Sequence, residues 1–151
     1  MSAAATAASC LFVIFGATGD LMRRKLLPAL FHLSESGQLP ANLHVLGVAR
    51  GSLNDTQFQL WARSSLAEAG FTASRVRHRW CNHCLHYHRL DQQTPAAFDA
   101  LRKRIDDLER EHALSGNRVF YLALPPQAFA GIIEGLGRAD LNREPGWTRR
   151  P

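Results

Sequence analysis

The chain has 151 residues, of which 46% are hydrophobic and 21% charged, as is typical of one globular domain. No run approaches the roughly 20 consecutive apolar residues that a membrane-spanning helix needs. The net charge of +5 leaves nucleic acid, a membrane surface or a phosphorylated small molecule as candidate partners, but the scattered Lys and Arg residues favour a solvated surface.

The first nine residues are small and uncharged. They lack the basic start and long apolar stretch of a secretion signal, so we expect a disordered tail and a cytoplasmic protein. Three cysteines, an odd number, do not indicate a disulfide framework. Residues 10–151 are expected to form one domain.

The first part of this domain is predicted to be a βαβ unit. Residues 10–15 (CLFVIF) are short, apolar and β-branched, which is typical of a strand buried in a parallel sheet. A turn follows over residues 16–19, and helical spacing begins at Asp20. Pro28 lies inside this helix and should kink it or end its first segment. Residues 43–48 predict the second strand.

The second part continues the alternation. Residues 55–69 and 94–112 have helical periodicity, residues 118–124 (RVFYLAL) predict a strand, and Pro126 suits the first turn of another helix. Residues 71–87 are the least regular, and we expect a loop there, followed by a short strand near residues 85–88. The pattern predicts an α/β fold: a Rossmann-type, doubly wound and mainly parallel sheet.

The turn Gly16-Ala17-Thr18-Gly19-Asp20-Leu21 has the residues and position of a phosphate-binding loop. Glycines let the backbone approach a pyrophosphate closely, and the N-terminus of a helix favours an anion. The general fingerprint is G-x-G-x-x-G. Thr18 and Leu21 replace its second and third glycines, so the pattern also fits a plain strand-to-helix turn.

Basic residues at two places in the sequence suggest phosphate contacts. Arg50 follows the second strand, where an arginine faces the 2′-phosphate in NADP-binding domains and an acidic residue holds the ribose in NAD-binding ones. Arg23, Arg24 and Lys25 lie near the start of a helix, where positive charge is unfavourable unless an anion is close. Solvated surface arginines are the alternative in both cases.

Residues 78–88 are rich in cysteine and histidine, which are metal ligands. Cys81 and Cys84 form a single Cys-x-x-Cys pair with no second pair along the chain. If this stretch is a strand, Cys84, His86 and His88 share one face and Leu85 and Tyr87 the other. We therefore expect a solvated strand edge and predict no metal site.

Three strings in the right order resemble the glucose-6-phosphate dehydrogenase family. They are IFGATGDLMRRKLLPALFHL, VLGVAR and NRVFYLALPP, spread over most of the chain. The resemblance implies an NADP-dependent oxidoreductase acting on a CH–OH group, which oxidises glucose 6-phosphate to 6-phosphogluconolactone in the pentose phosphate pathway of glucose metabolism.

The resemblance also assigns cofactor contacts to named positions. The pyrophosphate is expected to lie against Gly16, Ala17, Thr18, Gly19, Asp20, Leu21, Met22 and Arg23. Arg50 is expected at the 2′-phosphate, and the nicotinamide ribose near Ala123, Leu124 and Pro125. Phe129 stands where many relatives carry a tyrosine that touches the cofactor.

The chain departs from the family at its end. Relatives continue from G-W-x-R into a strand, E-K-P-F-G and later R-I-D-H-Y-L-G-K, whose first histidine is the general base, whereas this chain ends at Pro151. We therefore expect a sheet incomplete at its C-terminal end, no catalytic residue, no substrate domain or dimer interface, and no turnover by this chain alone. A stand-alone NADP-binding or regulatory module and a basic nucleic-acid-binding domain are the alternatives.

Overall fold

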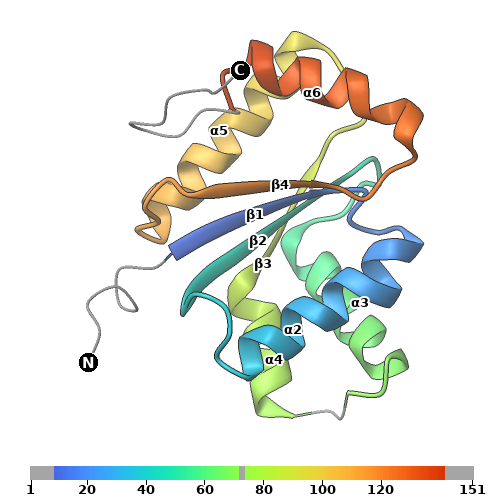
Figure 1. Cartoon of the computed structure of the whole chain (residues 1–151), viewed down its shortest axis with the longest axis vertical. Coiled ribbons are helices and arrows are strands. Elements are labelled where there is room, and N and C mark those ends of the chain that lie inside the picture. Colours follow the sequence, from blue (N-terminus) through green and yellow to red (C-terminus); the bar gives the residue numbers. More distant parts are fainter. Residues whose placement is uncertain (1–8, 72–73, 142–151) are drawn as a thin grey trace.

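The computed structural model describes residues 9–71 and 74–141 (Figure 1). Strands and helices alternate along these ranges. They are β1 (Ser9–Phe15), α2 (Leu27–Glu35), β2 (Asn42–Ala49), α3 (Asp55–Glu68), α4 (Arg75–Cys84), β3 (Leu85–Arg89), α5 (Pro95–Glu111), β4 (Arg118–Leu122) and α6 (Phe129–Arg138). Short helical turns of other types lie at Met22–Leu26 and Pro126–Ala128.

The strands form one parallel sheet in the order β3-β2-β1-β4. The chain builds outward from β1 to β3 and then crosses to the other side of β1 to form β4. This is the doubly wound arrangement predicted from the sequence. Among the described residues β4 is an edge strand, and its Val119 and Tyr121 are 40% and 41% exposed, which fits the expected uncovered edge.

Helices cover both faces of the sheet (Figure 1). On one face α5 and α6 pack over β1 and β2, and the apolar residues at helical spacing along α5 are all buried there: Phe98, Leu101, Ile105 and Leu108. On the other face α2, α3 and α4 form a second core with Phe31, Phe58 and Leu66. Burial on both faces explains why the central strands β1 and β2 are mostly apolar.

Pro28 changes the first helix as expected. Helical backbone begins at Asp20, passes through a π-helical turn at Met22–Leu26 and becomes α2 at Leu27. Pro28 lies in the first turn of α2, where it has no N–H to donate to the carbonyl four residues earlier. The π-helical hydrogen bonding therefore ends just before Pro28, and ordinary α-helical hydrogen bonding follows in α2.

The expectation of an irregular loop over residues 71–87 was wrong. Residues 75–84 form α4, whose start is capped by the Ser74 hydroxyl accepting from the Arg77 amide at 3.1 Å. Arg77 and Cys81, four residues apart, form its buried side, and Trp80 packs edge-on against Phe31. The helix could not be predicted from apolar periodicity, because its inward face carries an arginine and a cysteine instead of large apolar residues.

Ser9 was assigned to the tail, and this assignment was wrong. Ser9 is the first residue of β1 and is buried, and its hydroxyl donates to Ser115 Oγ at 2.8 Å. Residues 1–8 and 142–151, with the rest of the tail and the Gly146-Trp147 string, lie outside the described residues. No helix in the described ranges has the length and apolarity to cross a membrane.

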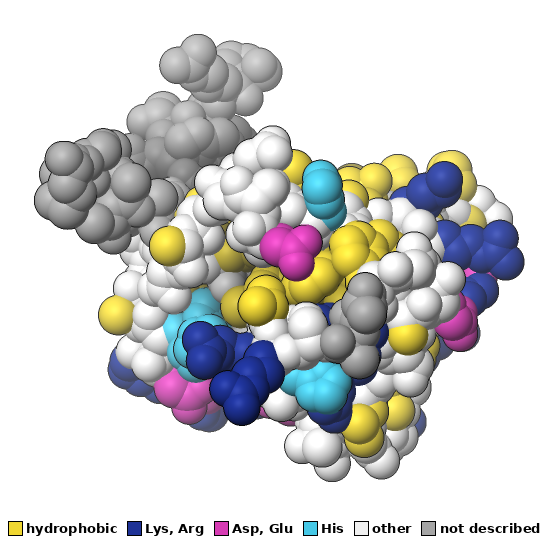
Figure 2. All heavy atoms as spheres, turned by 90° about the horizontal axis from the view of Figure 1, so that it is seen from below, with side chains coloured by type: hydrophobic (Ala, Val, Ile, Leu, Met, Phe, Trp, Pro, Cys, Tyr) yellow, Lys and Arg dark blue, Asp and Glu magenta, His cyan; other side chains and the backbone are white. Residues whose placement is uncertain are grey.

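Figure 2 shows the molecule from below the view of Figure 1. On this face the Lys and Arg side chains stand in separate groups, with hydrophobic, acidic and histidine side chains between them. Binding to a nucleic-acid backbone requires a basic patch or stripe, and this face does not offer a continuous one.

Candidate functional site

A cleft of about 830 Å³ opens at the carboxyl ends of the strands. Its walls come from the segments that follow β1, β2, β3 and β4. In doubly wound sheets ligands bind at this edge, at the point where the strand order reverses, because the connections diverge to opposite faces there. Here the strand order reverses at β1, because the chain adds β2 on one side of β1 and later β4 on the other.

The turn after β1 is held tightly beneath this cleft. Gly16 has a φ of +82° and donates its N–H to Val48 O at 2.9 Å. A Cβ atom at Gly16 would lie 2.2 Å from Ala123 O, so only glycine lets the ends of β1 and β4 approach this closely. Helical backbone starts at Asp20, and its first N–H groups have no partner within the helix. The turn can therefore present backbone amides to an anion.

Arg23 and Arg24, behind the turn, already have carboxylate partners. Arg23 contacts Asp20 at 2.9 Å and Glu68 at 2.6 Å, and Arg24 Nε lies 3.7 Å from Asp20. The hydrogen bond from Arg23 and the charge of Arg24 lower the pKa of Asp20. These pairs stabilise positive charge near the helix start, so the cluster does not require a phosphate.

Arg50 differs from these residues because its guanidinium is available. It lines the cleft beyond the end of β2 and is exposed. Within the described part of the chain it forms no ion pair, whereas the cleft's Asp20 and Asp91 are paired with Arg23 and Arg89. An exposed, unpaired guanidinium at this point suits a phosphate group.

The structure brings eight of the predicted residues together along the cleft. They are Gly16, Thr18, Gly19, Asp20, Arg50, Ala123, Leu124 and Pro125. The side chains of Ala17 and Met22 are buried in the core instead, and Leu21, Arg23 and Phe129 do not line the cleft. Any contact from Ala17 or Met22 would have to come from the backbone.

Sequence reasoning missed the part of the cleft that follows β3. Leu90, Asp91, Gln92 and Gln93 line it, together with Gln127, Ala128 and Ile132 near the start of α6. The signal was present, because a third parallel strand must end at the same edge as the first two. A short strand was predicted near residues 85–88, but the residues that follow it were not assigned to the site.

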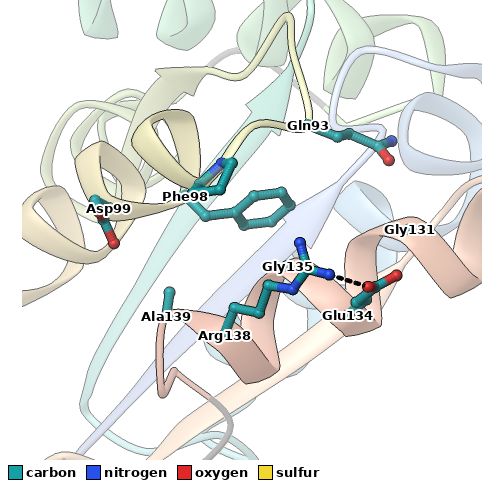
Figure 3. A pocket seen from close by; sticks show the side chains of 9 residues that line it. Gln93, Phe98, Asp99, Gly131, Glu134, Gly135, Arg138 and Ala139 are labelled. Carbon is teal, nitrogen blue, oxygen red and sulfur yellow. Dashed lines mark hydrogen bonds and ion pairs between the residues drawn. The ribbon is translucent and has the colours of Figure 1, made fainter.

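A smaller hollow of about 250 Å³ lies between α5 and α6 (Figure 3). Phe98 and the backbone of Gly131 and Gly135 form its floor, and Glu134 and Arg138 pair with each other at its rim. Its volume is below the 300–1,000 Å³ range of most ligand pockets, so the larger cleft is the better candidate site.

The Cys-x-x-Cys pair is poorly suited to binding a metal. Cys81 and Cys84 lie on α4, where burial raises the pKa of each thiol to about 11, whereas metals bind the thiolate. The expected solvated strand edge was also wrong for His86, which is buried beside His44, while Leu85 and Tyr87 are buried as predicted.

Comparison with known proteins identifies relatives of the chain. The family model described as glucose-6-phosphate dehydrogenase, NAD binding domain, matches residues 13–150. Glucose-6-phosphate 1-dehydrogenase from Aggregatibacter actinomycetemcomitans is 38% identical over 144 residues, and that from Chlamydia pneumoniae is 36% identical over 152 residues. Each alignment covers 95% of this chain and 29% of the relative, so the chain spans under a third of their length.

Solved structures agree with these matches. The crystal structure of glucose-6-phosphate 1-dehydrogenase from Mycobacterium avium superposes with a TM-score of 0.75 at 30% identity, covering 90% of this chain and 28% of that one. A glucose-6-phosphate dehydrogenase in complex with its substrate glucose-6-phosphate gives a TM-score of 0.73 at 29% identity, covering 84% and 26%.

Proposed function

The chain belongs to the glucose-6-phosphate dehydrogenase family through its NAD-binding domain, and on that premise we propose that it binds NADP as the cofactor-binding part of such an enzyme. The observation that carries the proposal is the cleft at the carboxyl ends of the strands, with a glycine turn on one side and the unpaired Arg50 on another. The parent reaction is the oxidation of glucose 6-phosphate to 6-phosphogluconolactone, and the proposed location is the cytoplasm.

The pyrophosphate lies against the turn after β1 in this proposal. Gly16, Thr18 and Gly19 line the cleft there, and the helix that begins at Asp20 directs its first amides toward the bound anion. Leu124 and Pro125 border the far wall, where the nicotinamide ribose is placed. The side chains of Ala17, Leu21, Met22 and Arg23 have supporting roles in shaping and holding this turn.

Arg50 provides the preference for NADP over NAD. Its guanidinium contacts the 2′-phosphate by charge-assisted hydrogen bonds. Asp91 lines the same cleft but is paired with Arg89 at 3.3 Å, so its negative charge is offset where the phosphate would approach.

The chain alone is proposed to bind the cofactor without oxidising the sugar. Hydride transfer requires the sugar in near-attack geometry and a base within hydrogen-bond reach of the reacting hydroxyl. The family's base-bearing string has no counterpart in the sequence. A cofactor-binding module without chemistry makes the same binding prediction, and an assay with glucose 6-phosphate and NADP⁺ should show no appreciable NADPH formation in either case.

Calorimetric titration with NADP⁺ and NAD⁺ tests the proposal. Arg50→Ala should weaken NADP⁺ binding roughly ten- to hundredfold, since hydrogen bonds to charged groups contribute about 1.5–3 kcal/mol, and should change NAD⁺ binding less than about threefold. Arg79→Ala, which removes an exposed arginine on α4, should leave both unchanged. An equal loss of both nucleotides in Arg50→Ala would overturn the role of Arg50, and a folded wild-type chain that ignores NADP⁺ would overturn the proposal.

A further inference from the structure

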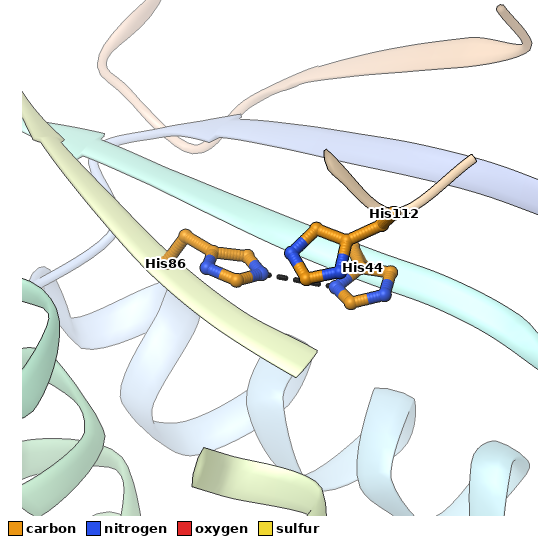
Figure 4. Close-up of side chains that lie close together, drawn as sticks. All are labelled: His44, His86 and His112. Atoms are coloured by element: carbon orange, nitrogen blue, oxygen red, sulfur yellow. Dashed lines mark hydrogen bonds between the residues drawn. The ribbon is translucent and has the colours of Figure 1, made fainter. Parts of the chain in front are cut away.

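Three histidines from distant parts of the chain meet near the amino-terminal ends of the strands, whereas the cleft lies at their carboxyl ends. His44 is the third residue of β2, His86 is the second residue of β3, and His112 directly follows α5. His86 pairs in register with Leu46, so His44 and His86 project from the same face of the sheet. Figure 4 shows the three imidazole rings gathered at the amino-terminal ends of these strands.

The ring nitrogens lie close together, and two of them share a hydrogen bond. His44 Nδ1 and His86 Nε2 are 2.9 Å apart, and one ring nitrogen of each of the three histidines lies within 4.8 Å of the others. Ligand nitrogens of a tetrahedral zinc ion are roughly 3.3 Å apart, given Zn–N bonds of about 2.0–2.1 Å. His44 and His86 therefore need to separate by only a few tenths of an ångström.

His112 is placed to complete the site. Its ring stacks on that of His44, with centroids 4.0 Å apart. Its Nε2 is buried without a hydrogen-bond partner among the described residues, and Glu111 Oε2 lies 3.5 Å from it. Its side chain is 22% exposed, whereas His44 and His86 are almost fully buried. Solvent therefore reaches the site from the side of His112.

The surrounding packing fixes two of the three rings. His44 and His86 are 1% and 7% exposed, so their imidazoles are held in place before any ion binds. His83 contributes a fourth imidazole at the margin, with its ring centroid 5.1 Å from that of His44.

A carboxylate stands behind one of the three rings. Asp55 Oδ2 lies 3.9 Å from His86 Nδ1 and is itself held by Tyr87 N–H and by Arg104, each at 2.8 Å. A carboxylate facing the outer nitrogen of a histidine favours the proton on that nitrogen and leaves the other as ligand, as in carboxylate–histidine–zinc arrangements. Asp55 also offsets the charge of Arg104, which would otherwise repel a cation.

We propose that His44, His86 and His112 form a binding site for one divalent transition-metal ion, with Zn²⁺ as the physiological candidate. Three imidazole ligands suit Zn²⁺, whereas Mg²⁺ and Ca²⁺ prefer oxygen ligands. The site lies near the amino-terminal ends of β2 and β3, away from the nucleotide cleft. The metal-site proposal therefore does not depend on the proposed binding of NADP.

Titration of the chelator-treated full chain with ZnCl₂, in a buffer that does not bind metal, tests this site. One Zn²⁺ per chain should bind and raise the melting temperature, while MgCl₂ should do neither. His112→Asn, at the most exposed of the three positions, should lose at least about tenfold in Zn²⁺ affinity, the lower range seen when groups supporting a metal site are removed. His78→Asn, an exposed histidine on α4, is the matched control and should bind as wild type does.

A second measurement distinguishes binding by the histidines from binding by the neighbouring thiols. Co²⁺ in place of Zn²⁺ should give visible absorption bands of a nitrogen-ligated ion without a thiolate charge-transfer band, and Cys84→Ala should keep full affinity. Circular dichroism establishes that each variant is folded. Absence of Zn²⁺ binding by the folded wild-type chain, unchanged affinity in folded His112→Asn, or loss of binding in folded Cys84→Ala would each overturn the proposal.

Discussion

Replacing Gly16 with alanine tests whether the close approach of β1 to β4 depends on a missing side chain. Gly16 has a φ of +82°, and alanine in this left-handed region costs about 1–2 kcal/mol. Its Cβ would also lie 2.2 Å from Ala123 O and 3.0 Å from a methyl group of Leu124. The carbonyl belongs to the backbone and cannot rotate away, so relieving the overlap should cost about a further 1–3 kcal/mol.

Gly37→Ala is the matched control for this prediction. Gly37 has a similar φ of +75°, but a Cβ there would have no neighbour within 4 Å. It should carry only the backbone strain, and the gain from a less flexible unfolded chain is common to both variants. Gly16→Ala should therefore lower the free energy of unfolding by about 1–3 kcal/mol more than Gly37→Ala.

Urea unfolding without nucleotide, followed by tryptophan fluorescence and circular dichroism, measures both losses. The two variants should keep the wild-type m-value, which would indicate that the folded and unfolded states expose the same surface as before. If Gly16→Ala were no less stable than Gly37→Ala, the contact between the glycine turn and the end of β4 would not constrain the chain, and the reasoning would be refuted.

The same unfolding measurement checks two further contacts. Gly135→Ala should lower the free energy of unfolding by about 1–3 kcal/mol, because its Cβ would lie 2.3 Å from the ring of Phe98. Adding Phe98→Leu should cost less stability in Gly135→Ala than in the wild-type chain, because the smaller side chain relieves the overlap. Additive losses would contradict the clash. Glu109→Ala should lose about 1.5–3 kcal/mol, because Glu109 accepts two hydrogen bonds from Arg118 at 2.7 and 2.8 Å and both side chains are largely buried. The exposed pair of Glu134 and Arg138 is the control for it, and Glu134→Ala should change stability by less than about 1 kcal/mol.

Most of the sheet could be predicted from local pattern. Residues 10–15, and residues 43–48 apart from His44, are apolar because both of their faces are covered. Such a continuous apolar run can be recognised in the sequence without the structure. The glycine turn was equally clear, since the positive φ of Gly16 is a local requirement. Helix α4 was missed because its inward side includes Arg77, whose guanidinium donates to Phe71 O instead of packing as an apolar side chain.

The sequence by itself therefore determined the order of the strands and of the helices other than α4, the glycine turn after β1, and the position of Arg50 just after the second strand. Each of these depends on residues close together in the chain. Only the tertiary structure decided which residues after β3 reach the cleft, and that His44, His86 and His112 lie together. Those arrangements depend on the register of parallel strands and on where α5 ends above them. Parallel register is set by the packing of helices against both faces of the sheet, and no single stretch of the chain carries that information.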